Sequence, residues 1–109
     1  MSKMNNFSIK PDLRDRYKII SYQKRLTMRE LLESDIVNLL DKKEQCYKAM
    51  GTPECSATLT IAIDSNIKQR MAEYKIETGS TFRDMVITAM VNRVMKEYSN
   101  ENLKPVDLI

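Results

Sequence analysis

The sequence predicts a mainly α-helical protein in which a two-stranded antiparallel β-ribbon lies beneath four helices. Three observations predict this fold. The 109-residue chain matches itself once, without gaps, at an offset of 54 residues; each half opens on a stretch of alternating apolar residues; and two segments of helical spacing follow each stretch. A half of about 42 residues is near the size below which chains rarely fold alone, so the halves should combine into one intertwined domain over residues 1–109.

The internal match is one of pattern more than of identity. Residues 26–32 lie over residues 80–86, and Lys42 lies over Lys96. The match divides the chain into a first repeat, a linker, a second repeat and a tail, at residues 4–42, 43–56, 57–98 and 99–109. Because neither half can pair its own strand, we expect one chain to form a pseudo-dimer.

Each repeat opens on a predicted strand, at residues 4–10 and 58–63. Both stretches alternate polar or small residues with apolar ones, which is the period of a half-buried strand, and Pro11 ends the first. The residues expected to face the core are Phe7, Ile9, Leu59, Ile61 and Ile63. The residues expected to face solvent are Met4, Asn6, Ser8, Thr58, Thr60 and Ala62.

Two helices should follow each strand. The first helices are expected to begin at Asp12 and at Asp64 or Ser65, because acidic and small polar residues favour a helix start. The apolar residues at helical spacing are Leu13, Tyr17 and Ile20 in the first repeat, and Ile67, Met71 and Tyr74 in the second.

The second helices should begin at capping boxes. Thr27 and Thr81 are each followed three residues later by an acid, Glu30 or Asp84. In such a box the hydroxyl accepts a hydrogen bond from one backbone amide and the carboxylate accepts one from another. The core-facing residues that follow are Leu31, Leu32, Ile36, Leu39 and Leu40, and in the second repeat Met85, Val86, Ala89, Met90 and Val94.

The composition excludes several classes of function. The chain has no histidine, which removes the commonest general base and every histidine-containing metal site. The two cysteines, Cys46 and Cys55, are too few for a structural zinc site. Gly51 and Gly79 are too far apart for a glycine-rich phosphate cradle. We therefore expect no catalysis, no metal and no cofactor.

The charge is modest, with 18 basic against 15 acidic residues and a net charge of +3. No apolar run approaches the roughly 20 residues that span a bilayer, and residues 1–10 contain no signal-peptide core. We expect a cytoplasmic protein with no membrane partner. Cys46 and Cys55 should be reduced residues of the linker in that compartment.

The order of strand, helix and helix resembles the ribbon-helix-helix family of DNA-binding regulators, of the MetJ/Arc/CopG type. Residues 59–64, Leu-Thr-Ile-Ala-Ile-Asp, are similar to the family's strand and the entry to its first helix. Residues 78–83, Thr-Gly-Ser-Thr-Phe-Arg, are similar to its glycine-containing turn. The resemblance covers both repeats; the first departs from it where Arg25 occupies the position of Gly79 and Asn5 that of Leu59.

The resemblance implies that the ribbon enters the major groove of double-stranded DNA. The side chains opposite the core would then contact base edges, namely Met4, Asn6, Ser8, Thr58, Thr60 and Ala62. Asn6 is suited to adenine, the three hydroxyls to several bases, and Ala62 to a thymine methyl group. Without the repeat, an ordinary solvated strand face would be the simpler interpretation.

The amino ends of the second helices are expected to contact phosphates, because free amides and the positive end of the helix dipole attract an anion there. Thr27 and Thr81 are helix caps first, and phosphate contact is an added role. The predicted phosphate-contacting residues are Lys3, Lys10, Thr27, Met28, Arg29, Ser80, Thr81, Phe82 and Arg83.

The sequence thus predicts a sequence-specific transcription regulator that represses by occluding a promoter. The resemblance is to regulators carried by plasmids and viruses of prokaryotes, which act in the host cytoplasm, and two chains are expected side by side on neighbouring DNA turns. One alternative is an antitoxin-like or adaptor module whose tail, residues 102–109, binds a partner protein. The other is a purely structural helical bundle, which predicts no salt-dependent DNA binding.

Overall fold

A computed structural model describes residues 4–48 and 53–109 of the chain. The elements in chain order are β1 (Met4–Ile9), α1 (Pro11–Gln23), α2 (Met28–Lys42), β2 (Ala57–Ala62), α3 (Ser65–Thr78), α4 (Phe82–Glu97) and the short 3-10 helix η1 (Pro105–Asp107). The described residues are therefore mainly helical with a two-stranded antiparallel sheet, which confirms the predicted fold class at this level.

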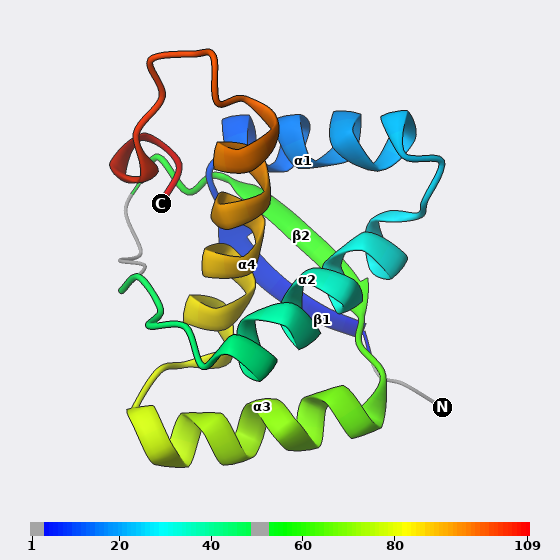
Figure 1. Ribbon diagram of the computed structural model, residues 1–109, viewed down its shortest axis with the longest axis vertical. Helices are drawn as coiled ribbons and strands as arrows, with labels where there is room; N and C mark the ends of the chain where they lie inside the picture. Colours follow the sequence, from blue (N-terminus) through cyan, green and yellow to red (C-terminus); the bar gives the residue numbers. More distant parts are fainter. Residues whose placement is uncertain (1–3, 49–52) are drawn as a thin grey trace.

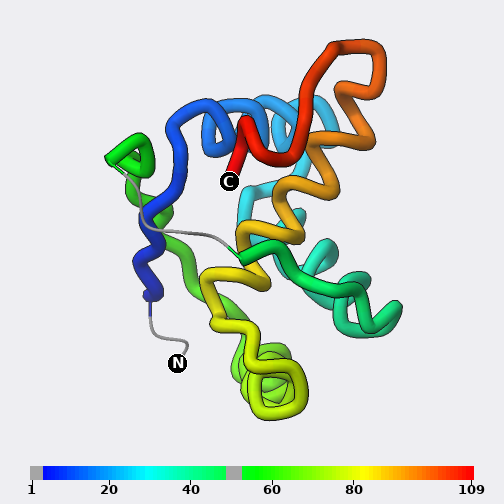
Figure 2. The backbone as a smooth tube through the Cα atoms, turned by 90° about the vertical axis from the view of Figure 1, so that its left-hand side faces the viewer, coloured from blue at the N-terminus to red at the C-terminus, as the bar shows by residue number. Residues whose placement is uncertain are grey.

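The two strands lie together along one side of the molecule, with the helices on the other (Figure 1 and Figure 2). At the centre of the ribbon, Asn6 of β1 lies opposite Thr60 of β2. Alternate side chains of both strands are buried beneath the helices, as a period of two requires. The buried residues are Phe7, Ile9, Ala57, Leu59 and Ile61, with Ile63 just beyond β2, and all except Ala57 were predicted to face the core.

The helices pack across the two halves of the chain. α2 and α4 lie against each other in front of the ribbon, α1 packs on α4 at one end of the molecule, and α3 packs on α2 at the other (Figure 1). Each of these three pairings joins a helix that precedes the linker to one that follows it. The two halves therefore share a single hydrophobic core.

The predicted apolar stripes form this core. All of their residues are buried except Ile67, which is half-buried. Helix α4 also buries Ile87, Thr88 and Val91, which lie outside the predicted stripe. The reason is its central position, because α4 contacts all three of the other long helices.

Both predicted capping boxes are present. Thr27 Oγ1 accepts the N–H of Glu30 at 3.0 Å, and Glu30 Oε1 accepts the N–H of Thr27 at 3.1 Å. Thr81 and Asp84 make the same reciprocal pair, with both distances 3.0 Å. Each cap contributes about 1 kcal/mol and fixes the residue at which α2 or α4 begins.

The first helices begin in two different ways. Asp64 caps α3, and its carboxylate accepts the N–H of Asn66 at 3.0 Å. The prediction that Asp12 starts α1 is wrong, because Lys10 is the N-cap residue and Pro11 is the first helical residue. Proline suits that position since its fixed φ is helical and it has no amide hydrogen to leave unpaired. Asp12 lies within the first turn, where its charge favours the helix dipole.

The tail returns to the core. Leu108 is fully buried, and Lys10 Nζ donates to the main-chain oxygens of Val106 and Asp107, both at 3.4 Å. The end of the chain is therefore packed against the beginning of α1.

Two turns adopt the left-handed backbone conformation 54 residues apart. Arg25 has φ of 57° between α1 and α2, and Gly79 has φ of 76° between α3 and α4. Lys43, with φ of 50°, ends α2 in the same way, so the linker does not prolong that helix. Glycine adopts this conformation readily, whereas a side chain raises its energy by roughly 1 kcal/mol.

Substitution at the two turns should have opposite effects. We expect Arg25→Gly to raise the free energy of unfolding by about 0.5–1 kcal/mol, because it removes backbone strain. Gly79→Ala should lower it by about 1 kcal/mol through strain alone, since an added Cβ meets no atom within 4 Å. Urea unfolding measures both, with Arg25→Ala as the control that removes the side chain and keeps the strain. A lower stability of Arg25→Gly than of Arg25→Ala would contradict this explanation.

Candidate nucleic-acid interface

The outer face of the ribbon carries six side chains in three cross-strand pairs. Met4 lies opposite Ala62, Asn6 opposite Thr60, and Ser8 opposite Thr58. Ala62 is half-buried and the other five are exposed, Met4 to 61%. These are the six residues predicted to face away from the core, so their predicted orientation is confirmed. We call them the ribbon face.

A hydrogen bond orders the centre of the ribbon face. Thr60 Oγ1 donates to Asn6 Oδ1 at 2.7 Å. This bond fixes the orientation of the Asn6 amide, which keeps its NH₂ group as a donor and a second lone pair on Oδ1 as an acceptor. The side chain therefore presents a donor and an acceptor side by side, the arrangement that matches an adenine edge.

The amino end of α4 lies beside the end of β1. Arg83 Nε donates to the main-chain oxygen of Ser8 at 2.9 Å, and Arg83 Nη2 lies 3.5 Å from Cys55 Sγ. The guanidinium therefore links the first turn of α4 to the carboxyl end of β1. A cation is held at that edge of the ribbon face.

The amino end of α2 lies beside the end of β2. Glu33 Oε2 accepts the N–H of Asp64, two residues after β2, at 2.6 Å, and Glu33 Oε1 lies 3.5 Å from Arg29 Nε. The starts of α2 and α4 thus flank the ribbon at its two ends. The Thr27 hydroxyl accepts a hydrogen bond from only one free amide of α2, that of Glu30. The first two amides of the helix, on Met28 and Arg29, have no carbonyl partner within the helix.

The predicted phosphate-contacting residues differ in their placement. Thr27, Arg29 and Thr81 are exposed, and Lys10, Met28, Phe82 and Arg83 are half-buried. Lys3 lies outside the described residues. The ammonium group of Lys10 lies against tail carbonyl groups, as described above.

The structure corrects the prediction that Ser80 is exposed and contacts phosphate. Its side chain is only 8% exposed and is hydrogen-bonded to the Cys46 thiol, and its N–H donates to Thr78 Oγ1 at 3.2 Å. The residue precedes the Thr81 cap and points inward, so neither its hydroxyl nor its amide is presented to an anion. Burial raises the pKa of the Cys46 thiol, and its hydrogen bonds with Ser80 and Thr88 only partly oppose that shift.

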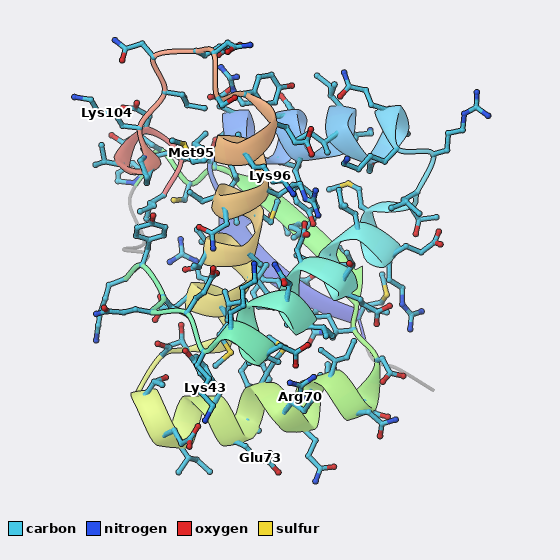
Figure 3. The ribbon with its side chains drawn as sticks, in the orientation of Figure 1. Lys43, Arg70, Glu73, Met95, Lys96 and Lys104 are labelled. Carbon is cyan, nitrogen blue, oxygen red and sulfur yellow. The ribbon has the colours of Figure 1, made fainter. Side chains whose placement is uncertain are left out.

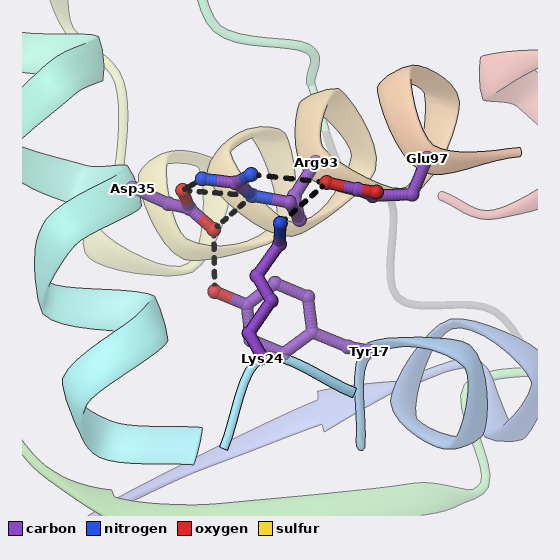
Figure 4. A network of polar contacts seen from close by, with 5 residues as sticks. All are labelled: Tyr17, Lys24, Asp35, Arg93 and Glu97. Carbon is purple, nitrogen blue, oxygen red and sulfur yellow. Dashed lines mark hydrogen bonds and ion pairs between the residues drawn. The ribbon is translucent and has the colours of Figure 1, made fainter. Parts of the chain in front are cut away.

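A polar network joins α1, α2 and α4, and the sequence analysis missed it (Figure 4). Tyr17 Oη donates to Asp35 Oδ2, and Arg93 Nη2 donates to Asp35 Oδ1, both at 2.7 Å. Arg93 Nη1 and Lys24 Nζ each form an ion pair with Glu97 Oε1 at 3.2 Å, on the more exposed side of the network. The Asp35 side chain is 8% exposed and that of Arg93 18%.

The charges of this network are fixed by their neighbours. Burial, and after it the Asp35 charge, raises the pKa of Tyr17, and the bond to Asp35 raises the pKa of Arg93. Hydrogen bonds from Lys24 and then Arg93 lower the pKa of Glu97. The network therefore holds α2 against α4 through the ion pair between Asp35 and Arg93.

The sequence contains a signal for this network. Asp35 lies three residues after Leu32 and four before Leu39, which places a carboxylate on the buried face of α2. A charge at such a position requires a partner, since an unpaired buried carboxylate is strongly destabilising. The pattern does not identify the partner, because Arg93 is 58 residues away.

Comparisons with known protein families, with characterised proteins and with solved structures find no match to this chain. In the described part of the chain, no helix has the length and apolar character needed to cross a bilayer.

Loss of Asp35 should be far more destabilising than loss of a surface acid. We expect Asp35→Ala to lower the free energy of unfolding by about 3–5 kcal/mol, because it leaves Arg93 and Tyr17 without their buried partner. Asp41→Ala is the control on the same helix; its ion pair with Arg70 at 2.6 Å is exposed and should cost less than about 1 kcal/mol. Urea unfolding compares the two. Equal losses would show that the network contributes nothing beyond surface charge.

Proposed function

We propose that this chain is a sequence-specific double-stranded DNA-binding transcription regulator, a repressor, that inserts its β-ribbon into the major groove. The observation that carries the proposal is the ribbon face, a row of exposed, mainly polar side chains on a two-stranded antiparallel ribbon. A ribbon of two strands fits the major groove, which is about 12 Å wide. We further propose that the fold is a tandem ribbon-helix-helix pseudo-dimer, of the family that the sequence resembles.

The strand register supports the pseudo-dimer. In a ribbon with twofold symmetry, the residue on the axis lies opposite its own equivalent. Asn6 lies opposite Thr60, and these residues are 54 apart, which is the offset of the sequence repeat. The pairs on either side, Met4 with Ala62 and Ser8 with Thr58, exchange under the same offset. The left-handed turns at Arg25 and Gly79 follow it as well.

The chemistry of the ribbon face supports base recognition. Asn6 can bond adenine through its amide, the hydroxyls of Ser8, Thr58 and Thr60 can bond several base edges, and apolar groups such as Ala62 can contact a thymine methyl. Because the residues differ between the two strands, the bound DNA site need not be palindromic. The starts of α2 and α4 on either side of the ribbon would contact the flanking phosphates.

Self-association on DNA is a further part of this proposal. Tyr22 on α1 is 68% exposed and Ile76 on α3 is 86% exposed, and the two positions are equivalent in the repeat. They lie on the helices at opposite ends of the molecule (Figure 1). Contact between α1 of one chain and α3 of the next would align chains along neighbouring major-groove turns, about 34 Å apart.

The packing of the tail weighs against the alternative of an interaction arm. Leu108 is fully buried, so residues 102–109 cannot leave the surface without exposing part of the core. We propose a location in the host cytoplasm, as expected for a regulator of this kind.

Base recognition is tested on a site selected from random DNA. We expect Asn6→Ala and Thr60→Ala to fold normally and each to lose about 1–3 kcal/mol of discrimination at one base position, because each removes a base contact. Fluorescence anisotropy with every single-base variant of the site measures this loss. Gln69→Ala, an exposed substitution on α3, is the control that should change nothing. Equal loss of affinity for all sequences would contradict base reading.

Phosphate contact is tested by salt. Arg29→Ala should weaken binding to every sequence alike and reduce the slope of log affinity against log salt by about 1, because one phosphate contact is lost. Arg70→Ala is the control, since Arg70 lies on α3, where it pairs with Asp41 of α2 on the side of the molecule that the helices cover (Figure 3). An unchanged slope in Arg29→Ala would place the phosphate contacts elsewhere, and salt-independent binding by the unmodified protein would favour the structural bundle.

A further inference from the structure

A polar cleft lies between the carboxyl-terminal halves of α2 and α4. Its volume is about 280 Å³, and it is lined by Asp35, Asn38, Lys42 and Glu44 on one side and by Ala89, Asn92, Arg93 and Lys96 on the other. This is slightly below the range of about 300–1,000 Å³ that holds drug-sized ligands. The cleft therefore has room for a small metabolite.

The cleft repeats the same side chains on its two walls. Lys42 and Lys96 are equivalent in the repeat, as are Asn38 and Asn92. Each wall thus offers one ammonium and one amide group. Such an arrangement suits a ligand that has similar polar groups at both ends.

The two lysines have no acidic partner among the described residues, since neither makes an ion pair within 4.0 Å there. The anionic groups of the cleft are already bonded to the protein. Asp35 is held by Tyr17 and Arg93, and Glu44 Oε2 accepts from Asn92 Nδ2 at 2.8 Å. The Asn92 amide does not neutralise Glu44, so the lining carries the three cations Lys42, Arg93 and Lys96 against two carboxylates, a net charge of +1.

A second cleft provides a comparison. It lies between the end of α2 and α3, has a volume of about 200 Å³, and is bordered by Lys43, Arg70 and Glu73 (Figure 3). Two acids, Glu73 and Glu77, line it together with those two cations, and Arg70 is paired with Asp41. Its charges balance within the protein, so it lacks the excess of cations found between α2 and α4.

We propose that the cleft between α2 and α4 binds a small dianion that carries one negatively charged group at each end. Lys42 and Lys96 each hold one of its two negatively charged groups, and the Asn38 and Asn92 amides bond the polar atoms between them. Both lysines lie in the last turns of their helices, where the helix dipole favours a cation over an anion. The affinity therefore depends on the side chains alone and is modest, with a dissociation constant on the order of 0.1–1 mM.

The cleft is separate from the ribbon face. Its helical residues begin at Asp35 in α2 and at Ala89 in α4, whereas the capping boxes that flank the ribbon lie at the opposite ends of the same helices. Binding of the dianion does not depend on the proposed DNA binding. A loss of either activity can be measured without the other.

The test is a titration of the whole ¹⁵N-labelled protein with succinate and, separately, with inorganic pyrophosphate at constant ionic strength. We expect saturable shifts of the Asn38 and Asn92 side-chain amide signals with one of these probes. Saturation by succinate identifies a dicarboxylate site, and saturation by pyrophosphate a phosphate-type site. Lys42→Gln and Lys96→Gln should each weaken binding several-fold, and the double variant should weaken it at least about tenfold, which corresponds to 1.4 kcal/mol.

Two controls make the result decisive. Lys18→Gln removes an exposed lysine of α1, and Arg29→Gln removes a cation beside the ribbon face; both should bind like the unmodified protein. Thermal unfolding shows that each variant is folded. The proposal is overturned if neither probe gives saturable shifts at about 20 mM, which is well above the expected dissociation constant. It is also overturned if Lys18→Gln or Arg29→Gln weakens binding as much as the double variant does.

Discussion

The pairing of β1 with β2 is the constraint on which the rest of the structure depends. A strand leaves backbone N–H and C=O groups unpaired, and neither half of the chain contains a second strand to pair them among the described residues. Once the strands pair, Phe7, Ile9, Leu59 and Ile61 form one apolar face that must be covered. α2 and α4 cover that face, and α1 and α3 close its two ends. The opposite face remains in solvent because all four helices lie on one side (Figure 2).

The ion pair between Asp35 and Arg93 adds specificity to this packing. Apolar stripes on α2 and α4 permit several alignments of two helices, whereas a buried carboxylate and guanidinium are satisfied in one. Burying the two charges is costly, so an apolar pair of similar volume would be about as stable, and we infer that the value of the ion pair lies in the choice of alignment. That alignment sets where the two capped helix starts flank the ribbon. Asp35 and Arg93 also line the cleft near the other end of the same helices.

Local pattern was sufficient to predict most of the fold. Alternation predicted which strand residues are exposed, and two capping boxes predicted where α2 and α4 begin. The features that sequence analysis missed depend on residues far apart in the chain, as with Asp35 and Arg93, or on packing around a cap, as with Ser80. Leu108 is buried by a return of the tail that no periodicity indicates. Arg25 adopts a conformation that its residue type disfavours, and only its position in the repeat relates it to Gly79.

The central proposal is that the ribbon face meets DNA in the major groove, and a dimethyl sulfate footprint on a selected site tests it most directly. This reagent methylates guanine N7 in the major groove and adenine N3 in the minor groove, so one reaction reports on both. The result we predict is protection of guanine N7 in the major groove, over one stretch for each bound chain, with adenine N3 unprotected there. Protection confined to adenine N3, or no protection on a bound site, would contradict the proposal.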